Sequence, residues 1–151
     1  MYFLMKSEPA DYSIDDLKRD KKTPWYGVRN YQARNYMKSM KLGDTIFFYH
    51  SSCDDVGIAG VGRVASKPYP DKTQFDKKSK YYEKRATIDT PVWMLVDIAF
   101  VKKFKKIVTL SEIRKHKALA HMKLLQRGSR LSISPVTQKE FEFILSLAHE
   151  K

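Results

Sequence analysis

The order of the predicted elements constrains the fold most, because strand and helix signals do not alternate regularly. Runs of apolar, β-branched and aromatic residues predict strands near 2–6, 45–50, 57–65, 92–100 and 130–133. Three or four helices are expected among them. The lack of alternation argues against a doubly wound sheet and favours an α+β fold with a small curled sheet. Three of the six glycines lie in 57–65. They predict a bulge or bend, and a partly closed barrel would hide the sheet edges.

The predicted helices begin at polar residues that can cap them. Ser13 precedes two acids, and Asn30 is placed to cap a second helix that runs to about residue 40. Thr109 and Thr137 each begin a Thr-x-x-Glu pattern, the signature of a capping box. The polar stretch Lys67–Arg85 carries two prolines and is expected to form a long loop.

The length and the cysteine count predict a simple organisation. A chain of 151 residues has room for one core, so we expect residues 1–151 to form a single domain. Cys53 is the lone cysteine, which rules out an intramolecular disulfide and suits a reducing compartment. No apolar stretch reaches the ~20 residues of a membrane span, and the start lacks a signal peptide. These features predict a soluble intracellular protein, of the cytoplasm or the nucleus.

The chain is strongly basic, with a formal net charge of +12. Such a field favours polyanions, because every neutralised phosphate releases condensed counterions. An anionic membrane surface would also fit, and so would a soluble protein from a lysine-rich proteome. Basic residues gather in two places, and residues 114–130 contain no acid. The expected phosphate-binding surface consists of Arg34, Lys102, Lys103, Lys105 and Lys106.

Catalytic motifs are not apparent in the sequence. Cys53 lies three residues from His50, but in a strand-to-loop context this spacing fixes no geometry. His116 and His121 are five residues apart, which is off the spacing that places two ligands on one helix face. No P-loop motif occurs. We therefore expect no catalytic residues, no metal site and no cofactor.

The stretch 25–35 is the densest in functional groups, with the sequence WYGVRNYQARN. Its aromatic, guanidinium and amide side chains stand just before a predicted helix, whose N-terminus suits an anion such as phosphate. Trp25 offers a stacking face for a base. A structural interpretation is equally open at this point, in which Trp25 fills the core and Asn30 only caps the helix.

Several motifs, in this order, resemble the EVE domain family of the PUA-like superfamily, and within it the thymocyte nuclear protein group. The resemblance spans nearly the whole chain, from Tyr2 to the last helix. The matching segments are 5–9 with 12–13, 25–35, 43–44 with 48–51, 57–62, 69–71, Trp93 with 96–97, and 130–136. Tyr26 departs from the pattern, because a small acidic or polar residue is common there, and it could reshape the rim of a pocket. The lysines of 67–85 would extend the phosphate-binding surface.

The resemblance implies a small mixed β-barrel of five or six strands flanked by helices. It implies a non-enzymatic module that binds DNA or RNA and holds one modified base in a pocket. Carried over by position, the pocket residues are Ser7, Trp25, Val28, Arg29, Asn30, Tyr49, His50 and Ser51. A second set consists of Trp93, Arg130, Ser132 and Pro135.

The sharpest expectation places Trp25, Arg29 and Asn30 on one wall, with 49–51 opposite. If that wall is open to solvent, Trp25→Ala should remove base recognition and leave melting nearly intact. If Arg29 contacts phosphate, Arg29→Ala should weaken binding to all strands alike. The main alternative is an enzyme acting on a nucleobase or nucleotide, with His50 as its one serious candidate base. A protein-interaction adaptor, which would need no pocket, is the third.

Overall fold

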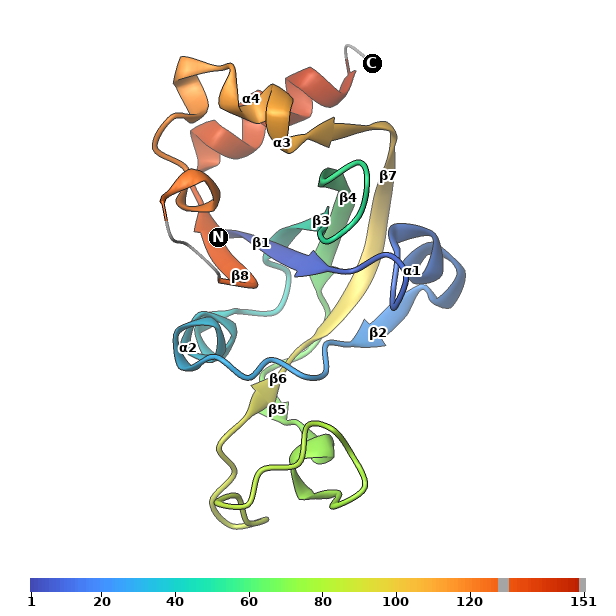
Figure 1. Cartoon of the computed structure of the whole chain (residues 1–151), viewed down its shortest axis with the longest axis vertical. Coiled ribbons are helices and arrows are strands. Elements are labelled where there is room, and N and C mark those ends of the chain that lie inside the picture. The colour runs from blue at the N-terminus through green and yellow to red at the C-terminus, as the bar shows by residue number, and fades with distance from the viewer. Residues whose placement is uncertain (128–130, 150–151) are drawn as a thin grey trace.

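A six-stranded mixed sheet forms the centre of the computed structural model, which describes residues 1–127 and 131–149. The strand order is β2 (Lys22–Pro24), β7 (Asp97–Thr109), β4 (Gly57–Val64), β3 (Thr45–His50), β1 (Tyr2–Ser7) and β8 (Ile133–Val136). Among the strand pairs that the described residues form in this sheet, only β1–β3 is parallel. The sheet curls into a half-barrel (Figure 1). The predicted α+β fold is confirmed.

Helices cover both faces of this sheet. Helices α1 (Ile14–Asp20) and α2 (Tyr31–Ser39) pack on one face. Helices α3 (Leu110–Arg114) and α4 (Gln138–His149) pack on the other. Three short 3-10 turns lie at 72–75, 117–119 and 123–125. None of the helices in the described part of the chain is long and apolar enough to cross a membrane.

The two covered faces explain the unbroken apolar run of β3. Side chains alternate along a strand, so Ile46 and Phe48 join the core under α1 and α2. Phe47 and Tyr49 join the core under α3 and α4. A strand buried on both faces needs no polar residue at every second position.

The predicted N-caps are confirmed. In four places a side-chain oxygen accepts a hydrogen bond from the backbone N–H three residues later, at 3.0–3.2 Å. The four capping residues are Ser13, Asn30, Thr109 and Thr137. These bonds satisfy N–H groups that have no partner within the helix.

The glycine-rich strand bends as predicted. The pairing register shifts in β4 between Ile58 and Gly60 and again between Val61 and Gly62. At Gly60, an added Cβ would lie 2.3 Å from the carbonyl oxygen of Lys102. Only glycine allows this close approach of two strands.

Several strand boundaries were wrongly predicted, and strand β2 was not predicted. Strand β7 continues past residue 100 to Thr109, because pairing with β4 supplies backbone partners that local sequence does not reveal. Strand β8 begins at Ile133, so it lies later than the predicted strand 130–133. The predicted turn at 128–129 and residue 130 lie outside the described residues.

The segment 71–93 projects beyond the sheet (Figure 1). It leaves and re-enters through the short pair β5 (Tyr69–Pro70) and β6 (Met94–Leu95). Buried Gln74 ties the two ends together. Its amide nitrogen donates to the carbonyls of Asp71 and Trp93, and its amide oxygen accepts from the N–H groups of Val92 and Trp93, all at 2.7–2.9 Å. The long loop is thus held by a satisfied buried amide.

Candidate functional site

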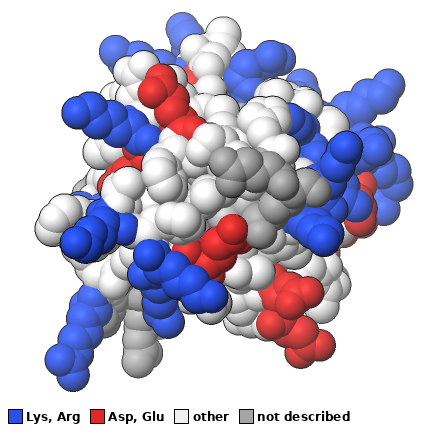
Figure 2. Space-filling model, turned by 90° about the horizontal axis from the view of Figure 1, so that it is seen from above, with Lys and Arg blue, Asp and Glu red and all other residues white. Residues whose placement is uncertain are grey.

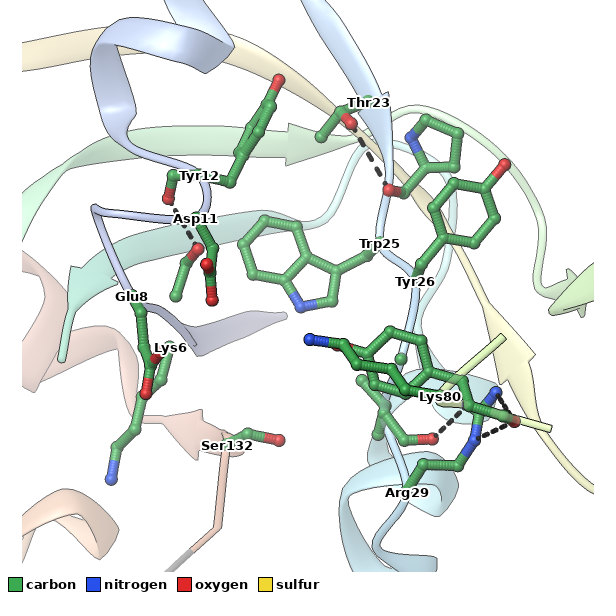
Figure 3. A pocket seen from close by; sticks show the side chains of 15 residues that line it. Lys6, Glu8, Asp11, Tyr12, Thr23, Trp25, Tyr26, Arg29, Lys80 and Ser132 are labelled. Carbon is green, nitrogen blue, oxygen red and sulfur yellow. Dashed lines mark hydrogen bonds between the residues drawn. The ribbon is translucent and has the colours of Figure 1, made fainter. Parts of the chain in front are cut away.

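A cavity of about 510 Å³ opens where the end of β1, the segment after β2 and the projecting loop meet. Figure 3 shows its side chains converging on a common space. Its lining consists of Lys6, Ser7, Glu8, Asp11, Tyr12, the segment 23–29, Lys80, Tyr81 and Ser132. The volume lies within the ~300–1,000 Å³ typical of ligand sites.

Trp25 belongs both to this cavity and to the core. Its side chain is 7% exposed, and its ring meets that of Phe48 edge-on at 5.5 Å. The indole Nε1 has no hydrogen-bond partner among the described residues, while every fully buried polar side-chain atom among them has one. The Nε1 therefore remains accessible, and Figure 3 shows it facing the middle of the cavity. It is an unused donor.

Tyr81 forms an aromatic wall on the side of the projecting loop. Its ring lies so close to Gly27 that a Cβ there would be 2.5 Å from the ring. Gly27 also has a φ of +86°, a conformation that favours glycine. The glycine of this segment thus permits the loop to close against Trp25's segment.

Arg29 fixes this loop in place. Its Nε and Nη2 donate to the carbonyl oxygen of Tyr81 at 3.1 and 2.8 Å, and its Nη1 contacts Asp71 at 3.2 Å. Further bonds reach the hydroxyl of Thr73 and the carbonyl of Val28. Asp71 is fully buried and also accepts from the N–H of Gly27. The guanidinium is therefore committed to protein groups rather than free for phosphate.

Four charged side chains in the lining have no hydrogen bond or ion pair with the described residues: Lys6, Glu8, Asp11 and Lys80. The Nζ of Lys80 lies 5.1 Å from the ring of Tyr81, and that of Lys6 lies 5.7 Å from Tyr49. Burial lowers the pKa of Lys6. Both charge signs are thus available to a ligand.

The structure brings part of the predicted pocket together. Ser7, Trp25, Val28, Arg29 and Ser132 line the cavity. Ser7 uses its hydroxyl to donate to the carbonyl of Tyr12 at 2.6 Å. Whether these residues contact a base stays a prediction.

Other predicted residues have structural positions outside the lining. Asn30 caps α2, and Pro135 pairs with Phe3 within the sheet. Trp93 is buried beside Arg29, and its Nε1 donates to Glu83 at 3.1 Å. Arg130 lies outside the described residues.

The expected opposite wall, residues 49–51, does not face the cavity. Tyr49 follows Phe48 in β3 and so points to the other face of the sheet, where burial raises its pKa to about 12. His50 is buried and accepts a hydrogen bond on Nε2 from the N–H of Ile14 at 3.1 Å. Burial lowers the pKa of His50. Ser51 donates its backbone N–H to the carbonyl of Ser7.

Ten of the fifteen lining residues were not among the predicted site residues. Glu8 lies inside a segment that was used for the family resemblance, and Tyr26 was expected at the rim. Asp11, Lys80 and Tyr81 carried no local signal, because they reach the cavity only through the folding of their loops.

The expected phosphate-binding residues do not form a single patch. The four lysines of β7 are exposed, but alternation along the strand sends them to two faces. Lys103 bonds to Asp15 at 2.7 Å, and Arg34 donates to the carbonyl of Val92 at 2.9 Å. Figure 2 shows basic side chains spread around the end of the molecule above the sheet, with acids among them. A role in phosphate binding stays a prediction.

Comparison with known proteins identifies relatives of this chain. The family model of the EVE domain matches residues 1–147. Human thymocyte nuclear protein 1 is 44% identical over 169 residues, which cover 99% of this chain and 75% of that protein.

Solved structures are similar to this chain over nearly its whole length. A Pseudomonas syringae protein is 47% identical, with a TM-score of 0.95, and the match covers 98% of this chain and 99% of that one. Human THYN1 in complex with 5-methylcytosine-containing DNA is 43% identical, with a TM-score of 0.93 and coverage of 99% and 98%. With the family model matched over nearly its whole length, this chain belongs to the EVE domain family.

Proposed function

We propose that this chain is a non-enzymatic DNA-binding module that holds one modified base, of the 5-methylcytosine kind, in the cavity at Trp25. The observation that carries the proposal is the cavity itself. It is lined by aromatic rings and unpaired polar groups, in a chain 43% identical to a protein solved with 5-methylcytosine-containing DNA.

The energetics of base capture fit such a cavity. Taking a base out of a stack costs a few kcal/mol, and least when the strand is already single. Stacking on an aromatic ring returns about 1–3 kcal/mol. Trp25 and Tyr81 both belong to the lining and offer aromatic rings for such stacking. A methyl group in an apolar pocket adds about 1–3 kcal/mol of discrimination, so selectivity for the modification alone should be modest.

An enzymatic alternative finds less support. No group of three His, Cys, Asp or Glu side chains that could hold a metal ion occurs in residues 1–127 and 131–149. His50, the candidate general base, uses its Nε2 lone pair on the N–H of Ile14 and lies outside the cavity lining.

A binding panel tests the proposal. Fluorescence anisotropy would compare DNA and RNA strands that carry one 5-methylcytosine, or one cytosine at the same place. We expect the methylated DNA to bind at least about fivefold more tightly, as one buried methyl group allows. Mass spectrometry should show that the recovered strands are unchanged.

Tyr81→Ala removes a wall of the cavity, and Tyr82→Ala is its matched control. Tyr82 is the next residue, 39% exposed and outside the lining. We expect Tyr81→Ala to abolish the preference for the methylated strand and Tyr82→Ala to preserve it. Equal binding of both strands by the unaltered protein would refute the proposal, as would conversion of the base.

A further inference from the structure

We propose that the cavity selects bases with an exocyclic amino group, and that Asp11 and Glu8 supply the acceptor that makes this choice. The inference builds on the proposed function and names the chemical class of base. It assigns a specificity role to two acids that are not among the pocket residues carried over from the family.

The first observation is the orientation of the unpaired groups. Trp25 is 7% exposed, and its Nε1 faces the cavity without a partner among the described residues. In Figure 3 the carboxylates of Asp11 and Glu8 lie on the side of the cavity opposite Lys80. A base lying between these groups would meet the Trp25 N–H donor and carboxylate acceptors, with the Lys80 ammonium as a further donor in the same lining.

The second observation is that the two acids, which are both exposed, have no charged partner among the described residues. Neither carboxylate forms an ion pair with a described lysine or arginine. Neither caps α1, whose first turn is bonded by Ser13 and Asp16. In a chain of net charge +12 that approaches a polyanion, two unpaired acids at the cavity repel phosphate. A base that donates hydrogen bonds would offset this repulsion.

The pattern of donors and acceptors matches cytosine and mismatches thymine. Cytosine carries an N4 amino donor next to the acceptors N3 and O2, and carboxylates accept from N4. The Trp25 N–H would donate to one of the acceptors while a carboxylate accepts from the amino group. Thymine presents the O4 acceptor in place of the amino group. A carboxylate facing O4 would lose its bond and repel the base.

Two comparisons between single-stranded oligonucleotides isolate the effect of the amino group. Single-stranded DNA that carries 5-methylcytosine or thymine at one site differs at the pyrimidine edge while the methyl group is kept. Cytosine against uracil repeats the comparison without the methyl group. We expect the amino-bearing base to bind at least tenfold more tightly in both comparisons, the scale of a lost charged hydrogen bond.

The double variant Glu8→Gln/Asp11→Asn should reduce both ratios to less than threefold, because an amide can accept from N4 or donate to O4. Its general affinity for DNA should not fall, since two repelling charges are gone. The control Asp54→Asn/Asp55→Asn removes the same charge from exposed positions outside this cavity. It should leave both ratios unchanged.

Equal binding of amino and oxo bases by the unaltered protein overturns the inference, and so does a double variant that keeps the selectivity. If 5-methylcytosine still binds better than cytosine in either case, the proposed function stands without it. If the methyl group has no effect but the amino preference is present, the proposed function fails alone. A lack of measurable binding to any strand overturns both.

Discussion

At the scale of single residues, Trp25 shows how one side chain can serve the core and the site together. Its backbone N–H donates to Val96 at 3.0 Å, and its ring packs against Phe48. Its Nε1 faces the cavity. Trp25 therefore belongs to the core and to the cavity lining at once, so the two interpretations of this residue do not exclude each other.

The burial of Trp25 changes the expected effect of its removal. Nearly intact melting of Trp25→Ala was expected only if the pocket wall is open to solvent. The ring of Trp25 is 7% exposed and lies within the core, so that condition is not met. We predict that Trp25→Ala lowers the free energy of unfolding by about 3–5 kcal/mol. Trp25→Phe keeps a ring in the core and should cost less. Urea denaturation measures both.

The role of Trp25 in binding is therefore tested with the phenylalanine variant. Trp25→Phe removes the Nε1 donor but keeps a stacking ring, so affinity for the modified strand should fall with the protein still folded. An alanine variant as stable as the unaltered protein would contradict the core assignment.

At the scale of elements, the projecting segment 71–93 is an ordered wall of the site. Gln74 links the two ends of the segment by hydrogen bonds to Trp93. Arg29 holds Tyr81 against the segment that carries Trp25. Asp71 is the fully buried partner of Arg29. Arg29 is therefore a positioning residue, and its effect on binding should come through the loop.

Arg29→Ala tests this positioning. The change leaves the Asp71 carboxylate buried without its cation, which costs about 3–5 kcal/mol in comparable pairs. We predict faster hydrogen–deuterium exchange in residues 72–85 and loss of the preference for a modified base. Arg85→Ala is the control, because Arg85 pairs with Glu83 at the surface. Unchanged exchange in Arg29→Ala would show that the loop is held by other contacts.

At the scale of the whole molecule, basic charge is spread over several elements. The lysines of β7 lie on two faces, and Lys6 and Lys80 stand at the cavity. Such a distribution attracts a polyanion from many directions, whereas the contacts within the cavity decide which base is held.

Salt separates these two contributions. We predict that DNA affinity falls steeply between 50 and 200 mM salt, by about 10³-fold if six phosphates are contacted. The ratio between modified and unmodified strands should change little, because the methyl group is uncharged. Titrations at several salt concentrations measure both quantities, and a flat salt dependence would rule out the phosphate-binding surface.

Replacing lysines tests where the phosphates lie. Lys102→Gln and Lys106→Gln should each reduce the salt slope by about one unit if β7 carries phosphate contacts. Lys103→Gln should reduce it less, because Lys103 is already bonded to Asp15. If all three variants kept the salt slope of the unaltered protein, β7 would carry no phosphate contacts, and the lysines at the cavity would be the next candidates.

The predicted fold was largely right where the signal is local. The caps at Ser13, Asn30, Thr109 and Thr137 need only a side-chain oxygen and an N–H three residues away. The bend of β4 follows from its glycines. The end of β7 was missed because strand pairing depends on a distant partner.

The sequence by itself determined the mixed α+β class, the helix starts and the family, since each rests on neighbouring residues or on motif order. Only the tertiary structure decided which side chains share the cavity. Alternation along β3 turned Tyr49 away from Phe48's face, and the folding of two loops brought Asp11 and Tyr81 to Trp25. The reason is physical: a local pattern fixes backbone conformation over a few residues, whereas a cavity is made by segments that meet only after the chain has packed.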